Sequence, residues 1–140
     1  MAGYDTALRL GDLLLVEVSQ LQPDTAIRIR QHKTGRVTHV RLRQETCRAA
    51  ADTIADHPAD PLVWPLWGQR DALYRCVRET VAGAGIRPGT FRWLRRSAAT
   101  QVERVSPGRS TELLGHASRG TTERWYLDRS QLADPPLPPW

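Results

Sequence analysis

Apolar residues recur along most of this chain at helical spacing, and in one stretch they alternate with polar residues. Apolar positions three or four residues apart indicate helices that bury one face against a core. The helices that this spacing predicts cover residues 5–18, 45–56, about 69 to 83 or 85, 90–105, 110–114 and 121 or 122 to 127. The pattern therefore predicts a mainly α-helical chain.

Residues 26–31 and 37–43 follow a different pattern, because apolar and polar side chains alternate there. A period of two is typical of strands with one buried face, and Gly35 lies where a turn between two strands is needed. Aliphatic side chains face one way and basic ones the other: Ile27, Ile29, Val40 and Leu42 against Arg28, Arg30, His39, Arg41 and Arg43. We therefore expect an antiparallel hairpin whose polar face carries four arginines.

These elements predict one α+β domain, mainly helical with a small antiparallel sheet. A chain of 140 residues is long enough for one domain with a sizeable core. We expect residues 1–130 to form the domain and residues 131–140 to form a proline-rich tail that cannot be helical. No bilayer-spanning run or signal peptide is evident, and Cys47 and Cys76 suggest core packing rather than a disulfide framework. We therefore expect a cytoplasmic protein.

The charge of the chain favours a polyanionic partner. Twenty basic and 15 acidic residues give a formal net charge of +5. Nineteen of the basic residues are arginine, and the one lysine, Lys33, lies in the predicted hairpin turn. An ammonium can release its proton within a reachable pH range, whereas a guanidinium effectively cannot. Lys33 is therefore a candidate proton donor, with a chance lysine in a turn as the alternative interpretation.

Arginines crowd the first turns of the helix predicted from Thr90. Arg92 shares a helical face with Arg95 and with Arg96, and like charges at this spacing repel. Cations also oppose the positive end of the helix dipole. A bound phosphate would relieve both effects, because guanidinium groups fit phosphate oxygens in bidentate fashion. A solvated basic face is the alternative interpretation.

Short motifs carry a resemblance that covers nearly the whole chain. Residues 113–118 read Leu-Leu-Gly-His-Ala-Ser, and residues 121–126 read Thr-Thr, three further residues and Tyr. Together they resemble the C-terminal signature of the tyrosine recombinases, the phage integrase family. Three more boxes resemble that family in the same order: Thr-Ala-Leu-Arg-Leu-Gly-Asp at 6–12, Lys-Thr-Gly-Arg at 33–36 and Leu-Arg-Arg-Ser-Ala-Ala-Thr at 94–100. One box is weak evidence, whereas four in register are specific.

The resemblance implies the recombinase catalytic domain and a site-specific reaction on double-stranded DNA. One strand would be cleaved and rejoined through a 3′-phosphotyrosyl intermediate, without a metal or another cofactor. The residues that would carry it are the nucleophile Tyr126, the phosphate-binding Arg9, Arg95, His116 and Arg92, the general acid Lys33, and Asp12, which would orient the arginines. The arginines expected to bind DNA around this site are Arg28, Arg30, Arg36, Arg41, Arg43 and Arg96. A homo-oligomer on DNA is also implied.

The chain departs from the family pattern at several points. Arg92 stands where the family usually has histidine or lysine, and a guanidinium is a poor base. Ala7 replaces a glycine that is common before the first arginine. The first box begins within ten residues of Met1, so we expect a partial catalytic domain that lacks the N-terminal DNA-clamping domain. A catalytically inactive DNA-binding remnant and a type IB topoisomerase-like enzyme are the alternatives.

Overall fold

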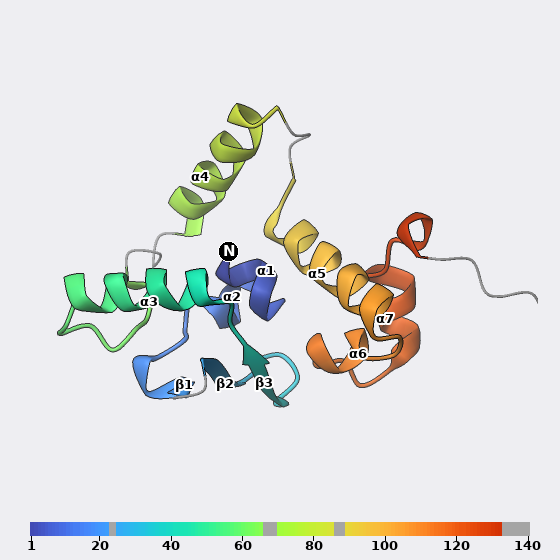
Figure 1. Cartoon of the computed structure of the whole chain (residues 1–140), viewed down its shortest axis with the longest axis horizontal. Helices are drawn as coiled ribbons and strands as arrows, with labels where there is room; N and C mark the ends of the chain where they lie inside the picture. The colour runs from blue at the N-terminus through green and yellow to red at the C-terminus, as the bar shows by residue number, and fades with distance from the viewer. Residues whose placement is uncertain (23–24, 66–69, 86–88, 133–140) are drawn as a thin grey trace, which may run out of the picture.

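A computed structural model of the chain describes residues 1–22, 25–65, 70–85 and 89–132. Figure 1 shows one small sheet with the helices above it and to one side. The helices are α1 (Ala2–Thr6), α2 (Leu10–Leu13), α3 (Gln44–Asp56), α4 (Arg70–Gly83), α5 (Phe91–Val105), α6 (Ser110–Leu113) and α7 (Arg119–Trp125). The strands are β1 (Leu21–Gln22), β2 (Ala26–Arg30) and β3 (Val37–Arg41), and short 3-10 turns occupy Val18–Gln20 and Arg129–Gln131. The predicted fold class, mainly helical with a small antiparallel sheet, is confirmed.

The sheet is antiparallel in the order β1-β2-β3, and its register confirms the predicted hairpin. Ile27 pairs with Val40 and Ile29 pairs with Thr38, and all four side chains are buried. Arg28, which lies between the two isoleucines, is exposed. Directly opposite residues of an antiparallel pair lie on the same face. The hairpin therefore covers the core with one face and presents arginines on the other.

Two clusters of buried apolar residues hold these elements together. The first joins the sheet to α2 and α3 and includes Leu13, Ile27 and Val63. The second lies under α5 and α6 and includes Ala98 and Leu114. Helix α1 contacts both α5 and β3, and in Figure 1 it lies between the sheet and the α5–α7 side of the molecule. The segment that follows α1 therefore lies at the junction of the two clusters.

The helix predicted over 5–18 is wrong, because the chain breaks after Thr6. Helix α1 ends there, Ala7 adopts a left-handed conformation with φ 48°, and α2 begins only after Arg9. The Thr6 hydroxyl accepts the backbone N–H of Leu8 at 3.2 Å. Such a local bond competes with helical hydrogen bonding, and leucine spacing does not reveal it. The break leaves Arg9 in an extended conformation as the N-cap of α2.

Most of the other predicted helices are found, and the last one is shifted. Helices α3, α5 and α6 lie where the sequence predicts them. Helix α7 begins at Arg119 rather than at Thr121 or Thr122 and ends at Trp125, which leaves Tyr126 just past its C-terminal end. The expected helix start near 69 and all but two residues of the expected tail at 131–140 lie outside the described residues.

Helix α4 does not pack into the core as the sequence predicts. In Figure 1 it extends away from the sheet, and none of its described side chains is fully buried. The predicted core position of Cys76 is wrong, because its side chain is exposed, whereas Cys47 is half-buried against the first cluster. None of the helices within the described ranges is long and apolar enough to cross a membrane.

Candidate active site

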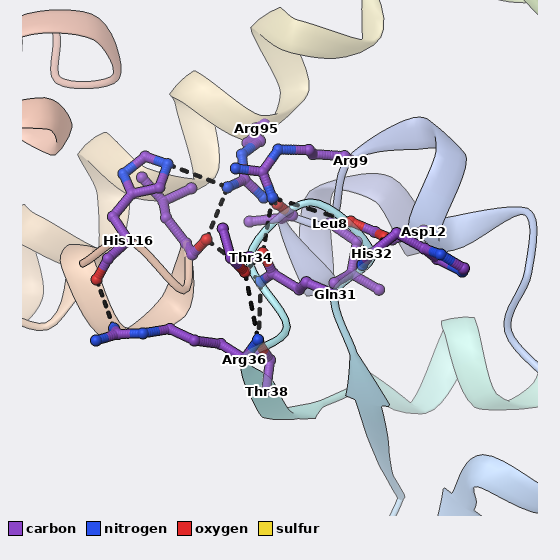
Figure 2. A network of polar contacts seen from close by, with 12 residues as sticks. Leu8, Arg9, Asp12, Gln31, His32, Thr34, Arg36, Thr38, Arg95 and His116 are labelled. Carbon is purple, nitrogen blue, oxygen red and sulfur yellow. Dashed lines mark hydrogen bonds and ion pairs between the residues drawn. The ribbon is translucent and has the colours of Figure 1, made fainter.

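Segments far apart in the sequence bring basic and aromatic side chains to one place. Arg9 comes from the start of α2, Arg95 from α5 and His116 from the loop after α6 (Figure 2). The Tyr126 ring packs edge-on against the His116 ring, with 4.7 Å between the two ring centroids. Within the described ranges, no three His, Cys, Asp or Glu side chains gather as a metal site would require. We call the group formed by Arg9, Arg95, His116 and Tyr126 the arginine cluster.

Arg95 is the buried centre of this cluster, with 3% of its surface exposed. One of its terminal nitrogens donates to the carbonyl of Ala7, in the break after α1. The other donates to the carbonyl of Leu114 at 2.7 Å and lies 3.3 Å from Nε2 of His116. The Arg95 Nε has no hydrogen-bond partner among the described residues. The cluster therefore holds a buried cation with a donor to spare, which suits an anionic ligand.

Arg9 supplies the second positive charge of the cluster. Its Nη1 donates to Oε1 of Gln31 at 2.7 Å and lies 4.0 Å from Oδ2 of Asp12. Burial lowers the pKa of Arg95 to about 10, and the charge of Arg9 acts in the same direction. Arg95 still carries its charge at neutral pH. Among the described residues, the one ion pair of these two guanidinium groups is that of Arg9 with Asp12, and a bound phosphate would stabilise both charges further.

The hydrogen bonds of His116 define its protonation. A guanidinium can only donate, so the contact with Arg95 makes Nε2 of His116 the acceptor. Nδ1 of His116 lies 2.9 Å from the Thr122 hydroxyl oxygen, to which it can donate. Burial, followed by the charges of Arg95 and Arg9, lowers the pKa of His116 to about 4. The imidazole is therefore neutral at physiological pH, with its proton on Nδ1.

Tyr126 is half-buried, and guanidinium groups lie near its ring. The Cζ atoms of Arg95 and Arg92 lie 5.3 Å and 5.9 Å from its ring centroid. The Thr100 hydroxyl donates to the Tyr126 carbonyl at 3.5 Å and accepts the backbone N–H of Asp128 at 3.0 Å, which anchors this segment to α5. Arg92 is exposed. The side chain that replaces the usual histidine or lysine therefore lies beside the phenol.

Lys33 lies in the exposed hairpin turn, beside the arginine cluster rather than within it. It lines a surface hollow together with Arg9, Asp12 and His32. Oδ1 of Asp12 accepts the backbone N–H of His32 at 2.9 Å, which ties α2 to the turn. Lys33 is exposed and therefore borders the same hollow as Arg9.

The arginines expected to bind DNA fall into two groups. All six are exposed, on the sheet, beside it or on α5: Arg28, Arg30, Arg36, Arg41, Arg43 and Arg96. Three of them also have partners in the protein, and the first is Arg30, which donates to the carbonyl of Gly35 at 2.8 Å. Arg36 donates to the carbonyl of His116 at 2.6 Å, and Arg43 forms an ion pair with Asp5 at 2.6 Å. Arg36 thus joins the hairpin to the His116 loop, a contact that the sequence pattern does not indicate.

Two polar side chains that are not among the predicted site residues support the cluster. Thr122 is fully buried and holds Nδ1 of His116. Gln31 is fully buried and holds Arg9. One signal could have identified Gln31, because the alternation that buries Ile27 and Ile29 places residue 31 on the same inward face. A polar residue at an inward position requires a hydrogen-bond partner.

This arrangement can be compared with known proteins. The model of the phage integrase family matches residues 1–132. Among solved structures, the chain is similar to a crystal structure of XerA recombinase, with a TM-score of 0.77 and 23% sequence identity. The similarity covers 93% of this chain and 52% of the XerA chain, so this chain spans about half the length of that protein. No curated protein sequence matches the chain. Because the family match extends over nearly all of its residues, the chain belongs to the phage integrase family and forms a tyrosine recombinase domain.

Proposed function

We propose that this chain cleaves and rejoins double-stranded DNA through a covalent bond to Tyr126. The phenol oxygen attacks a phosphodiester, a 3′-phosphotyrosyl bond forms, and the 5′ oxygen leaves as a hydroxyl. Attack by a 5′-hydroxyl on the phosphotyrosyl bond reverses the step, and exchange of 5′ ends between duplexes gives recombination. The observation that supports this most is the packing of the Tyr126 ring against His116, with the Arg95 guanidinium 5.3 Å from the ring centroid.

In this proposal Arg9 and Arg95 bind the non-bridging oxygens of the scissile phosphate. Catalysis of phosphoryl transfer depends mainly on positioning and on stabilising charge at these oxygens. Arg95 is held by two backbone carbonyls, so its guanidinium is oriented before a ligand arrives. Guanidinium groups supply here the charge that Mg²⁺ supplies in many other phosphoryl-transfer enzymes. We therefore propose a reaction that does not depend on a metal ion.

We also propose how the protons move. Lys33 protonates the departing 5′ oxygen from the hairpin turn. Arg92 binds phosphate and cannot accept the phenol proton, which passes to water. In the free chain Nε2 of His116 accepts a bond from Arg95. A phosphate that binds Arg95 releases this nitrogen, and its negative charge favours protonation at Nε2 and a bond from His116 to the phosphate.

We further propose that the exposed arginines of the sheet and of α5 bind the DNA backbone around this site. Such contacts release counterions, so binding weakens as salt rises. In this proposal residues 1–130 form the catalytic unit, and the reaction takes place in the cytoplasm. Copies of the chain assemble on DNA, because recombination joins two duplexes. Contacts to the DNA backbone carry no sequence information, so contacts to the bases would select the DNA sequence.

Arg92 supports a second candidate function. A guanidinium beside the phenol cannot remove the phenol proton. The chain would then be a DNA-binding member of the family that does not cleave. Both candidates predict DNA binding that weakens with salt, and only the first predicts a covalent adduct.

Covalent trapping separates the two candidates. The full chain is incubated in EDTA with nicked duplexes of randomised sequence, and the products are separated on a denaturing gel. We expect a protein–DNA adduct that Tyr126→Phe abolishes and Tyr4→Phe retains, since Tyr4 packs against the cluster that includes Ala98 and Leu114 and its ring lies against Arg43. DNA binding without an adduct for the wild-type chain would favour the second candidate, and an adduct only with Mg²⁺ would contradict metal independence.

A further inference from the structure

Both the oxygen and the nitrogen of the Gln31 side-chain amide form hydrogen bonds inside the protein. It follows β2 directly and is fully buried. Its Oε1 accepts from Nη1 of Arg9 at 2.7 Å and from the Thr34 hydroxyl at 3.3 Å. Its Nε2 donates to the Thr38 hydroxyl oxygen at 2.9 Å and to the carbonyl of Leu114 at 3.3 Å (Figure 2). Both lone pairs and both protons of the amide are therefore engaged, which fixes its orientation.

These bonds also connect the two arginines of the cluster. The Leu114 carbonyl that accepts from Gln31 accepts from Nη2 of Arg95 at 2.7 Å as well. A continuous path of hydrogen bonds thus runs from Arg9 through Gln31 and this carbonyl to Arg95. The two guanidinium groups repel each other, and the lowered pKa of Arg95, caused first by burial and then by Arg9, reflects this. The Gln31 amide and the Leu114 carbonyl are uncharged, and their hydrogen bonds hold the two guanidinium groups together against this repulsion.

We propose that Gln31 is a positioning residue, which fixes the Arg9 guanidinium relative to Arg95 so that both can bind one phosphate. The inference rests on the proposed function, in which that phosphate belongs to DNA. An amide suits this role because it holds Arg9 without neutralising its charge. A carboxylate at this position would pair with Arg9 and would have no proton for the Leu114 carbonyl. An aliphatic side chain would leave Nη1 of Arg9 without this partner.

The test compares Gln31→Glu and Gln31→Met with a matched control, Thr38→Val. The control removes one bond of the Gln31 amide within the hairpin and keeps the bond between Gln31 and Arg9. Inorganic phosphate is titrated into each full-length chain while NMR follows the arginine Nε–Hε signals, which Arg9→Lys and Arg95→Lys assign. In the wild type we expect both signals to report one dissociation constant. Both Gln31 variants should bind phosphate about tenfold more weakly, and Thr38→Val should bind as the wild type does.

A second measurement connects the role to the reaction. In the trapping assay, we expect Gln31→Met to lower the rate of adduct formation at saturating DNA and to leave the DNA concentration for half-maximal rate unchanged. If Gln31 had a purely structural role, Thr38→Val and Gln31→Met would both form the adduct more slowly, each in proportion to its loss of stability. That result would overturn the proposal. Unchanged phosphate affinity in folded Gln31 variants, or no response of the wild-type Arg9 signal to phosphate, would also overturn it. Failure of the wild-type chain to form an adduct would contradict the proposed function alone, because the phosphate titration still decides the role of Gln31.

Discussion

Gly115 lies so close to Gln31 that a Cβ atom at position 115 would be 2.4 Å from the Gln31 Nε2. Gly115 also has φ 62°, a conformation that side chains rarely adopt. The glycine before His116 therefore allows the loop backbone to approach the buried amide that holds Arg9. The geometry of the Gly115-His116 pair thus depends on Gln31, a residue of the hairpin.

We expect Gly115→Ala to destabilise the chain by about 3 kcal/mol, because it adds backbone strain and forces Gln31 to move. Gly35→Ala is the matched control. Gly35 has φ 66°, but a Cβ atom there would meet nothing within 4 Å, so we expect a cost of only about 1 kcal/mol from strain. Urea unfolding of both variants measures the difference, and equal losses would contradict the close approach to Gln31.

Asp12 is expected to hold the hairpin turn through the backbone N–H of His32. Asp12→Ala removes the acceptor, and we expect amide hydrogen exchange at His32 to become about tenfold faster. Asp12→Asn keeps an oxygen for this bond and should retain most of the protection. Equal exchange at His32 in the wild type and in Asp12→Ala would show that the carboxylate does not fix the turn in solution.

The stability of the chain should depend on pH through His116. Burial and the charges of Arg95 and Arg9 lower its pKa from the ordinary 6.5 to about 4 in the folded chain, so the unfolded chain takes up a proton that the folded chain does not. Stability is therefore expected to fall by roughly 3 kcal/mol as pH drops from 6.5 to 4. Urea unfolding across this range measures the fall. His116→Gln should remove this contribution and exposed His39→Gln should not, whereas an unchanged pH slope in His116→Gln would contradict the assignment.

Arg92 should limit the rate of strand cleavage, because it lies beside the phenol and cannot accept a proton. We expect Arg92→His to raise the rate of adduct formation about tenfold or more near pH 7, since general base catalysis contributes factors of this size and above. Arg92→Ala controls for removal of the charge. A histidine variant no faster than the alanine variant would show that proton removal from Tyr126 is not limiting.

The faces of the hairpin and the order of the chemical residues could be predicted from the sequence. The alternation that separates Ile27 and Ile29 from Arg28 is a local property, and the sheet register reproduces it. The boxes that contain Arg9 and Arg95 are recognised by side-chain identity alone, so their order along the chain does not depend on the fold. These features therefore needed no tertiary information.

The break after α1 and the support of the cluster could not be predicted in the same way. The break places the Ala7 carbonyl on Arg95, a partner 88 positions away in the sequence. Ala7 has φ 48° there, a left-handed conformation that a glycine would adopt at less cost. The partners of Gln31 come from α2, the hairpin and the Leu114 loop. Local periodicity carries no information on such contacts, which arise only when distant segments pack together.

The covalent bond to Tyr126 is the central claim, and mass spectrometry of the trapped adduct tests it most directly. The adduct is digested with nuclease and trypsin, which cuts after arginine and releases residues 125–129 as one peptide. We predict that this peptide carries a nucleotide joined to Tyr126 through its 3′ phosphate, with a free 5′-hydroxyl on the other DNA fragment. A nucleotide on another residue, or a linkage through a 5′ phosphate, would contradict the account.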